Sequence, residues 1–221
     1  MTKIFLDTAN LDEIKFFLDR GIGDGVTTNQ RIFLKEGGID FKQRVLDICE
    51  FGFGEWDFHV SVETTSKGID NIINEGLEYA SWHRKIVVKI AIDGAGDGLA
   101  AIHNLKKKRK DIKINATCMV NFNQLFLADK AGADYVSFFF NRSRDAGYEP
   151  IDFIENYRRS DCHSQLIVGS IRSPLDFEQA VVFGADIVTV PPKILHEMMF
   201  DQKTEDTIKE FDDAWKEFQS K

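Results

Sequence analysis

Short apolar runs alternate with longer segments of helical spacing along the whole chain, and this alternation restricts the fold more than any other feature. The eight apolar runs begin near Lys3, Gly25, Asp57, Ile86, Lys113, Tyr135, Gln165 and Asp186. In the segments between them apolar residues recur at intervals of three and four, as do Ile69, Ile72, Ile73 and Leu77. Strands that alternate with helices form a parallel sheet, and eight repeats can close into a (β/α)₈ barrel.

The main alternative is a doubly wound open sheet, which normally has a phosphate-binding glycine loop after its first strand. Here that run ends Phe5-Leu-Asp-Thr-Ala9, and the glycines of Asp93-Gly-Ala-Gly-Asp-Gly98 lack the dinucleotide-binding spacing. The second segment instead predicts a turn that leads into a helix. With 221 residues, 43% of them hydrophobic, and no shift in composition that marks a linker, we expect one α/β domain over 1–221, a single TIM barrel.

A further helix is expected after the last strand, over about 204–219. Ile208, Phe211, Trp215 and Phe218 follow one another there at intervals of three and four. An apolar stripe of this kind needs a surface to cover it. That surface is either the protein's own barrel or a second molecule.

Composition excludes several classes of partner. The net charge of −8 argues against a nucleic-acid-binding surface, and the basic run 106–110 is explained by a solvated helix end. No apolar stretch approaches the about 20 residues that span a bilayer, and no signal peptide precedes the first strand. Three cysteines without paired spacing suit a reducing compartment. We expect a cytoplasmic protein with no membrane or nucleic-acid partner.

Lys89 lies inside the apolar run Lys85-Ile-Val-Val-Lys-Ile-Ala-Ile92. A charged amine is costly to bury, and burial favours the neutral amine, which attacks carbonyl groups. The run by itself leaves open a lysine at the rim that keeps its charge in water.

Polar residues at the ends of the other runs favour a catalytic site, because the carboxyl ends of barrel strands meet at one mouth. They are Asp7, Thr27, Thr28, Asn29, Glu63, Asn115, Thr117, Asn141, Arg142, Ser170 and Arg172. Each has a simpler explanation: Asp7 or Glu63 could cap a helix, the threonines are good strand formers, and the arginines could form surface ion pairs. Together they indicate a phosphate-bearing carbonyl substrate, a lysine nucleophile and carboxylates that move protons.

Six segments resemble the small transaldolase family, which includes fructose-6-phosphate aldolases. They are Phe5-Leu-Asp7-Thr, Gly25-Val-Thr-Thr-Asn29, Val60-Ser-Val-Glu63, Ile86-Val-Val-Lys89, Ala131-Gly-Ala-Asp-Tyr-Val-Ser137 and Gly169-Ser-Ile-Arg172, and Phe183-Gly-Ala-Asp-Ile-Val-Thr-Val-Pro191 extends the match. The resemblance implies a (β/α)₈ barrel and a Schiff-base reaction that uses no metal and no cofactor.

The resemblance also implies roles for individual residues. Lys89 would form the Schiff base, Asp7 would move the hydroxyl proton during carbon–carbon cleavage, and Glu63 and Thr117 would hold a catalytic water. The substrate-binding set would comprise Thr27, Asn29, Asn115, Ser137 and Phe139 around the three-carbon unit and Arg142, Ser170 and Arg172 at the phosphate. The family's carboxyl-terminal helix reaches a neighbouring subunit, which implies a homo-oligomer, a pentamer or a decamer.

Glu63, Asn115 and Phe139 stand where transaldolases have glutamate, asparagine and phenylalanine, whereas the aldolases have glutamine, a nonpolar residue and tyrosine. We therefore expect transfer of a dihydroxyacetone unit from a ketose phosphate to an aldose phosphate. The alternatives are an aldolase that releases free dihydroxyacetone and a barrel that binds sugar phosphates without catalysis. Four residues depart from the family pattern, namely Gln30, Arg31, Ala91 and Phe138, and they leave the substrate preference open.

Overall fold

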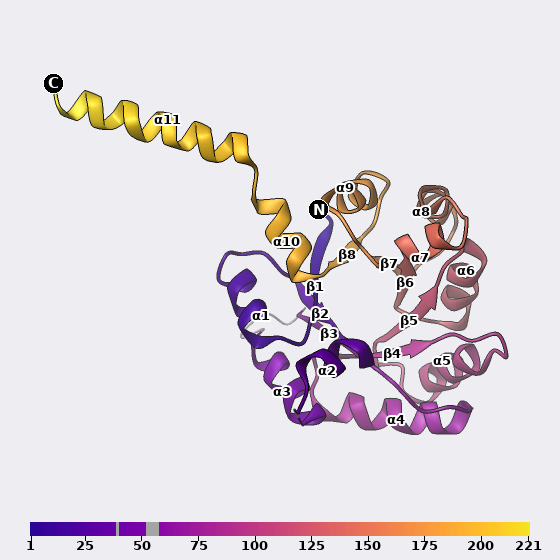
Figure 1. Ribbon diagram of the computed structural model, residues 1–221. Coiled ribbons are helices and arrows are strands. Elements are labelled where there is room, and N and C mark those ends of the chain that lie inside the picture. Colours follow the sequence, from indigo (N-terminus) through magenta and orange to yellow (C-terminus); the bar gives the residue numbers. More distant parts are fainter. Residues whose placement is uncertain (39, 52–57) are drawn as a thin grey trace.

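The computed structural model describes residues 1–38, 40–51 and 58–221. Eight parallel strands close into one barrel, in which each strand pairs with the next along the chain and β8 pairs with β1 (Figure 1). The strands are β1 (Lys3–Asp7), β2 (Gly25–Thr27), β3 (His59–Glu63), β4 (Ile86–Ala91), β5 (Ile114–Met119), β6 (Tyr135–Phe139), β7 (Gln165–Gly169) and β8 (Ile187–Val190). The predicted (β/α)₈ barrel is confirmed and the open sheet is excluded.

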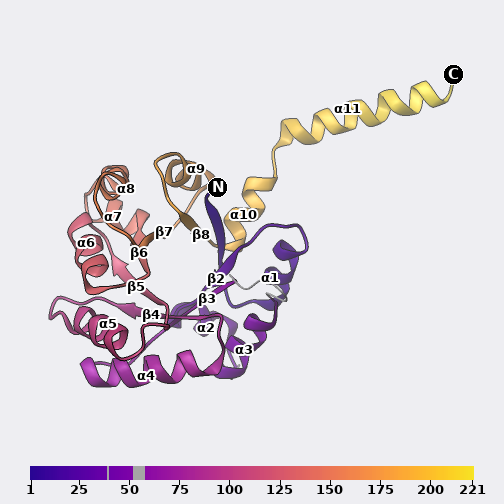
Figure 2. The same cartoon turned by 180° about the vertical axis from the view of Figure 1, so that it is seen from behind.

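The helices, except the last one, form a ring around the strands, which Figure 2 shows from behind. They are α1 (Leu11–Leu18), α2 (Gln30–Glu36), α3 (Phe41–Phe51), α4 (Ile69–Trp82), α5 (Asp97–Lys108), α6 (Phe122–Ala131), α7 (Phe140–Asp145), α8 (Pro150–Arg159), α9 (Pro174–Val182), α10 (Pro192–Met199) and α11 (Gln202–Gln219). Among the described residues the pattern of one helix after each strand has exceptions, because two helices follow each of β2, β6 and β8.

The main hydrophobic core lies between the strands and this ring. On α4, Ile72 and Ile73 are buried and Leu77 packs against the core, as the helical spacing predicts. Because strand side chains alternate between faces, a strand residue such as Phe138 packs outward under the helices, and its neighbours Ser137 and Phe139 face the interior.

The glycine-rich segment after β4 is the predicted turn into a helix. The carboxylate of Asp93 accepts hydrogen bonds from the backbone N–H groups of Ala95, Gly96, Asp97 and Gly98 at the start of α5. Gly98 packs so closely on β4 that a Cβ would lie 2.2 Å from the carbonyl oxygen of Ala91. The glycine therefore sets the distance between helix and strand.

Several boundaries differ from those expected. The third strand starts at His59, and Asp57, where the run was expected to begin, lies outside the described residues. The sixth strand ends at Phe139, so Asn141 and Arg142 lie on the short helix α7 rather than at a strand end. The fifth strand continues past Thr117 to Met119 through an irregularity in its pairing with β6. Apolar periodicity locates an element but does not locate its last residue.

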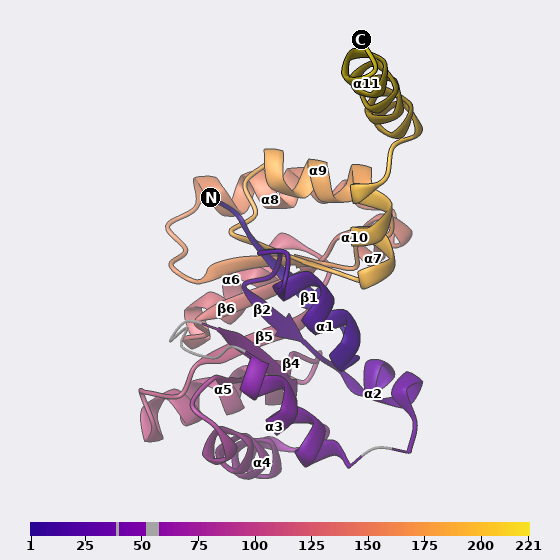
Figure 3. The same ribbon diagram turned by 90° about the vertical axis from the view of Figure 1, so that its left-hand side faces the viewer.

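The last helix, α11, begins at Gln202, two residues before the expected start, because Asp201 caps it through hydrogen bonds from the N–H groups of Lys203 and Thr204. The helix projects away from the barrel (Figures 1 and 3). None of its residues is buried, and the stripe residues Ile208, Phe211, Trp215 and Phe218 are all exposed. The alternative in which this helix packs on its own barrel is wrong.

Candidate active site at the barrel mouth

Lys89 lies inside the barrel, and its side chain is almost fully buried. Its Nζ lies 3.0 Å from Oε2 of Glu63 on the neighbouring strand β3 and donates a hydrogen bond of 3.0 Å to the carbonyl oxygen of Thr28. The register places Glu63, Lys89 and Asn115 side by side on β3, β4 and β5. The alternative in which this lysine lies at the rim with its amine in water is excluded.

Asp7 lies at the end of β1, where it accepts a hydrogen bond from the hydroxyl of Thr27 at 2.9 Å. Burial raises the pKa of the Asp7 carboxyl, and the charge of Lys89 and the bond from Thr27 offset this only in part. Thr27 Oγ1 also contacts Thr189 Oγ1 of β8 at 2.5 Å. Since Thr27 gives its proton to Asp7, Thr189 donates to Thr27, and three side chains form one short chain that ends on the carboxylate.

Neither carboxylate caps a helix. The N-cap of α1 is Asn10, and α4 follows Gly68 without a capping side chain. The capping explanation for Asp7 and Glu63 is therefore wrong. Both carboxyl groups remain available for chemistry beside the lysine.

On β5, Thr117 is fully buried, and its Oγ1 has no hydrogen-bond partner among the residues that the structure describes. The next residue, Cys118, has φ of 69°, a left-handed backbone that is uncommon for a residue with a side chain. This turn coincides with the irregular pairing of β5 and β6, and such bulges change the direction of a side chain. A buried hydroxyl without a partner is a place where a water or a substrate oxygen can bind.

Asn115 and Ser137 form a buried pair on β5 and β6, in which the Ser137 hydroxyl donates to Asn115 Oδ1 at 2.8 Å. Asn29 follows β2 and caps α2, since its Oδ1 accepts from the N–H groups of Arg31 and Ile32. Its oxygen is thus already used, so only its NH₂ group can bind a substrate.

The two arginines lie beyond the ends of β6 and β7. The exposed Arg142, on α7, has its guanidinium carbon 4.7 Å from the ring centre of Phe139, at the end of β6. Arg172, just after β7, forms an exposed two-pronged ion pair with Asp145. Arg172 therefore forms the surface ion pair that the sequence analysis gave as its simpler explanation. Arg172 also lies at the mouth of the barrel, as expected.

Asp176 organises this side of the mouth, and the sequence analysis did not identify it. Its carboxylate accepts from Asn141 Nδ2 at 2.7 Å, from the N–H of Arg172 at 3.0 Å and from Arg144 at 3.0 Å. Burial would raise the pKa of Asp176, but these hydrogen bonds outweigh it and hold the pKa below its ordinary value. Asn141 also donates to the carbonyl oxygen of Ser170, whose φ is 61°.

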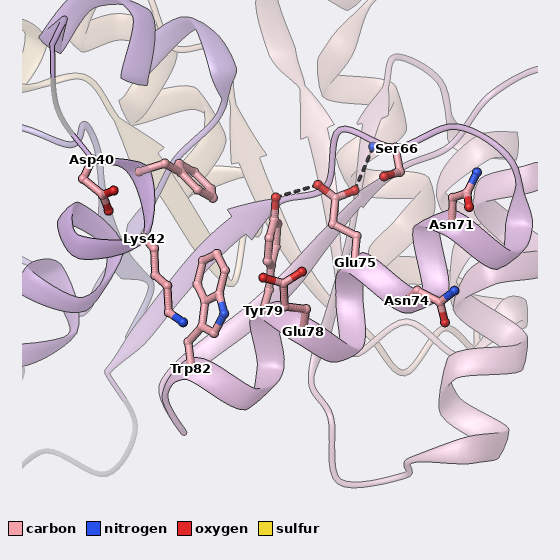
Figure 4. Close-up of a pocket in the computed structure, with 10 residues that line it drawn as sticks. Asp40, Lys42, Ser66, Asn71, Asn74, Glu75, Glu78, Tyr79 and Trp82 are labelled. Carbon is pink, nitrogen blue, oxygen red and sulfur yellow. Dashed lines mark hydrogen bonds between the residues drawn. The ribbon is translucent and has the colours of Figure 1, made fainter.

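The loop that follows Glu63 is fixed by Glu75 of α4. Its carboxylate accepts hydrogen bonds from the N–H groups of Thr65 and Ser66, from the Thr65 hydroxyl and from the Tyr79 hydroxyl. Figure 4 shows Glu75 between Ser66 and Tyr79, on the wall of an open pocket outside the barrel. Glu75 thus fixes the backbone of Thr65, which lies two residues after Glu63.

A cavity of about 320 Å³ lies on the β2–β3 side of the site. Asn29, Gln30, Thr65 and Glu63 line it with polar groups, and Phe33, Phe41 and Tyr79 form an aromatic wall. Gln30 donates to the carbonyl oxygen of Thr64 at 3.3 Å.

The four departures from the family pattern lie in different surroundings. Gln30 is part of this cavity beside Glu63, and Arg31 is exposed on the first turn of α2. Phe138 is fully buried and packs on Phe153, away from the mouth. Ala91 is the last residue of β4. Gln30 therefore lines the same cavity as the catalytic candidate Glu63.

The sequence matches the family model described as transaldolase/fructose-6-phosphate aldolase over residues 4–221. The chain belongs to this family. It is 37% identical to a "Probable transaldolase" of Roseiflexus sp. (strain RS-1) over 221 residues, which cover 98% of each chain. A "Probable transaldolase" of Dehalococcoides mccartyi is 38% identical over 221 residues, with 98% of this chain and 99% of the relative covered.

Solved structures outside the transaldolase family share the fold. The 3-hexulose-6-phosphate synthase from Salmonella typhimurium superposes with a TM-score of 0.59 at 18% identity, covering 88% of this chain and 90% of that one. The thiamine phosphate pyrophosphorylase from Pyrococcus furiosus gives 0.59 at 14% identity, covering 89% and 93%. At these identities the likeness concerns the barrel alone.

The barrel brings together most of the predicted site residues. Lys89, Glu63, Asp7, Thr27, Asn115, Thr117 and Ser137 line its interior, and Phe139, Arg142, Ser170 and Arg172 lie at the mouth beyond β6 and β7. Besides Asp176, the sequence analysis missed Ser61 and Thr189, which bond to site residues. Ser61 could have been found from the sequence. It lies two residues before Glu63 on the same strand, so the alternation of side chains places both on the same face.

Proposed function

We propose that this protein is a transaldolase that acts through a lysine Schiff base without a metal. It transfers a dihydroxyacetone unit from a ketose phosphate, fructose 6-phosphate or sedoheptulose 7-phosphate, to an aldose phosphate, erythrose 4-phosphate or glyceraldehyde 3-phosphate. The observation that carries the proposal is a buried lysine in contact with a carboxylate, with a second carboxyl group at the same mouth of a transaldolase-family barrel.

Formation of the Schiff base begins with the amine of Lys89. It passes its proton to Glu63, 3.0 Å away, and attacks the C2 carbonyl carbon of the ketose. The resulting carbinolamine loses its hydroxyl as water and becomes a protonated imine. Glu63 supplies the proton that this water needs, and the free hydroxyl of Thr117 is a binding place for the water.

Asp7 performs the second proton transfer. Its carboxylate takes the proton of the C4 hydroxyl while the C3–C4 bond breaks, so that C4 leaves as an aldehyde and the bonding electrons move into the imine. The donor aldehyde departs and the acceptor aldehyde enters. The enamine carbon attacks the new aldehyde, Asp7 returns the proton to the new hydroxyl, and water releases the ketose product.

Binding groups lie on two sides of the lysine. Asn115, Ser137 and the NH₂ group of Asn29 suit the hydroxyls of the three-carbon unit. Arg142, Ser170 and Arg172 suit the phosphate at the other end, where two guanidinium groups give charge-assisted hydrogen bonds. A bound phosphate would compete with Asp145 for Arg172.

Trapping of the imine tests the proposal. Borohydride reduction in the presence of fructose 6-phosphate should attach one three-carbon unit per subunit to the peptide that contains Lys89. Lys85 provides an internal control, because it is also buried but lies before β4 begins, away from the strand's carboxyl end. Adduct on another lysine, or an active preparation without adduct, would contradict the mechanism. Lys89→Ala should abolish turnover and leave the fold intact.

A further inference from the structure

A continuous chain of buried hydrogen bonds runs from the proposed site toward the amino ends of the strands. The Ser137 hydroxyl donates to Asn115 Oδ1 at 2.8 Å, and Asn115 Nδ2 donates to Ser61 Oγ at 3.0 Å. Ser61 Oγ lies 2.5 Å from Nε2 of His59, at the start of β3. All four residues are at most 4% exposed, so bulk water cannot replace any of these bonds.

The orientation of the Asn115 amide gives the chain its direction, because Nδ2 points toward Ser61 and Oδ1 points toward Ser137. Ser61 accepts from Asn115, and the only other partner of its hydroxyl in the described structure is His59 Nε2. With the amide in this orientation, a proton on Nε2 would make both that nitrogen and Asn115 donors to Ser61, and the Ser61 proton would have no acceptor among the described residues. Ser61 therefore donates to Nε2, and the ring proton lies on Nδ1.

The surroundings of His59 agree with a neutral ring. The imidazole lies between the rings of Phe5 and Tyr135, each with its centre 4.6 Å away. Nδ1, which carries the ring proton in this arrangement, has no hydrogen-bond partner among the described residues, so Ser61 is the one described partner that can hold the ring in this tautomer. Burial, helped by the charges of Lys3 and Lys89, lowers the pKa of His59 to about 3. The ring is thus neutral under ordinary conditions and can act as a permanent acceptor.

We propose that His59 is a positioning residue which, through Ser61, fixes the orientation of the Asn115 amide and thereby determines which groups the site offers the three-carbon unit. Asn115 must then present its remaining N–H as a donor, and Ser137, whose proton is engaged, must present its oxygen as an acceptor. The assignment rests on the proposed function only in taking Asn115 and Ser137 as the groups that bind the substrate.

The tautomer can be observed without any assay of activity. The ring-nitrogen NMR shifts of His59 in protein labelled with ¹⁵N-histidine should show a neutral ring protonated at Nδ1 at pH 7. In Ser61→Ala, which removes the donor, this preference should weaken or disappear. A charged ring, or a proton on Nε2 in the unmodified protein, would overturn the proposal.

Kinetics test the consequence for binding. His59→Phe keeps an aromatic ring but removes the acceptor, and we expect kcat/KM for fructose 6-phosphate to fall by about 3- to 10-fold, the scale of one neutral hydrogen bond, through KM. KM for erythrose 4-phosphate should not change. His59→Gln offers an amide oxygen to Ser61 and should recover most of the loss.

Two further variants separate positioning from packing. Ile167 and Phe5 belong to the same small apolar cluster. Ile167→Val alters this cluster but removes none of the hydrogen bonds between His59 and Ser137, so it should leave KM for fructose 6-phosphate and for erythrose 4-phosphate unchanged. Ser61→Ala should reproduce the kinetic effect of His59→Phe, and it serves if that variant fails to fold. Equal losses in His59→Phe and His59→Gln would show that the ring acts only through packing. Absence of an adduct on Lys89 would instead contradict the proposed function and leave the tautomer result standing.

Discussion

The chemistry of the site depends on how individual side chains are paired inside the barrel. Lys89 contacts Glu63, whereas Asp7 is joined to Thr27 and Thr189 on the other side. The two carboxylates therefore have different partners although both lie at the same mouth. This difference supports separate roles, which substitutions at each position can distinguish.

Substitution of either carboxyl group should block a different step. Asp7→Asn should stop carbon–carbon cleavage but still allow imine formation, so borohydride should trap the uncleaved six-carbon donor on Lys89. Glu63→Gln should slow formation and hydrolysis of the imine, with a loss of about 10²–10⁴-fold in turnover. Rapid-quench measurement of each step checks the assignment. The same lost step in both variants would contradict it.

Asp7 should also reduce the stability of the fold at neutral pH. Its folded-state pKa is raised above the ordinary 3.8, so the folded protein holds the proton more tightly than the unfolded chain does. Stability is therefore lost as pH rises above about 3.8, and the loss remains at pH 7. Asp7→Asn should raise Tm at pH 7 by about 2–4 °C for each kcal/mol that the free energy of unfolding gains. This rise in Tm should become smaller toward pH 4. The exposed Asp12→Asn is the matched control, and an unchanged or lower Tm in Asp7→Asn would contradict this.

Phe139 should determine what the enamine reacts with. A phenylalanine ring cannot donate a proton to the enamine carbon, so the intermediate waits for an acceptor aldehyde. Phe139→Tyr should increase release of free dihydroxyacetone from fructose 6-phosphate relative to transfer onto erythrose 4-phosphate. Both products can be measured in one coupled assay. Fast release without acceptor by the unmodified protein would favour the aldolase alternative and leave the role of Lys89 unaffected.

Among the elements, the segment between β3 and α4 connects the site most directly to the helical ring. Thr64 bonds through its N–H to the carbonyl oxygen of Lys89 and through its carbonyl oxygen to Gln30. Glu75 then holds Thr65 and Ser66. The position of Glu63 is therefore determined by β4, α2 and α4 together.

Glu75 should contribute stability that depends on pH. Burial alone would raise its pKa, but hydrogen bonds from Tyr79, Ser66 and Thr65 outweigh burial and lower the pKa below the ordinary 4.5. Its contribution is thus present above about pH 4.5 and is lost as pH falls through the lower folded-state pKa. Glu75→Gln should lower the free energy of unfolding in urea at pH 7, and less so near pH 4. Glu78→Gln, one turn away and exposed, should have little effect at either pH, and an equal loss in both variants would exclude this role for Glu75.

At the scale of the whole molecule, α11 presents an apolar stripe that needs a surface to cover it. The helix extends from the barrel with an exposed apolar stripe, in which Trp215 stacks on Phe218 at 5.4 Å. Such a surface is unfavourable in water unless another surface covers it. The homo-oligomer implied by the family resemblance, a pentamer or decamer, remains a prediction. No helix in the described ranges has the length and apolar character to cross a membrane.

Disruption of the stripe should dissociate the predicted homo-oligomer. Phe211→Lys places a charge among the apolar residues of α11, whereas Asp212→Lys adds a lysine at the next position, outside the stripe. Sedimentation velocity should show smaller particles for the first variant and unchanged particles for the second. Identical masses for both variants and the unmodified protein would show that α11 does not hold subunits together.

The sequence by itself determined the barrel, and it identified most of the candidate residues that the structure brings together at the mouth. The repeated alternation of strands and helices predicts a closed parallel sheet, and Lys89, Asp7 and Glu63 stand out as candidates because charged residues are rare in buried strands. Only the tertiary structure showed that Asn141 and Arg142 lie on a helix, that Arg172 pairs with Asp145, and that Ser61, Thr189 and Asp176 hold the site residues in place. These partners lie on different strands and loops, and their contacts are set by register and loop geometry, which local periodicity does not encode.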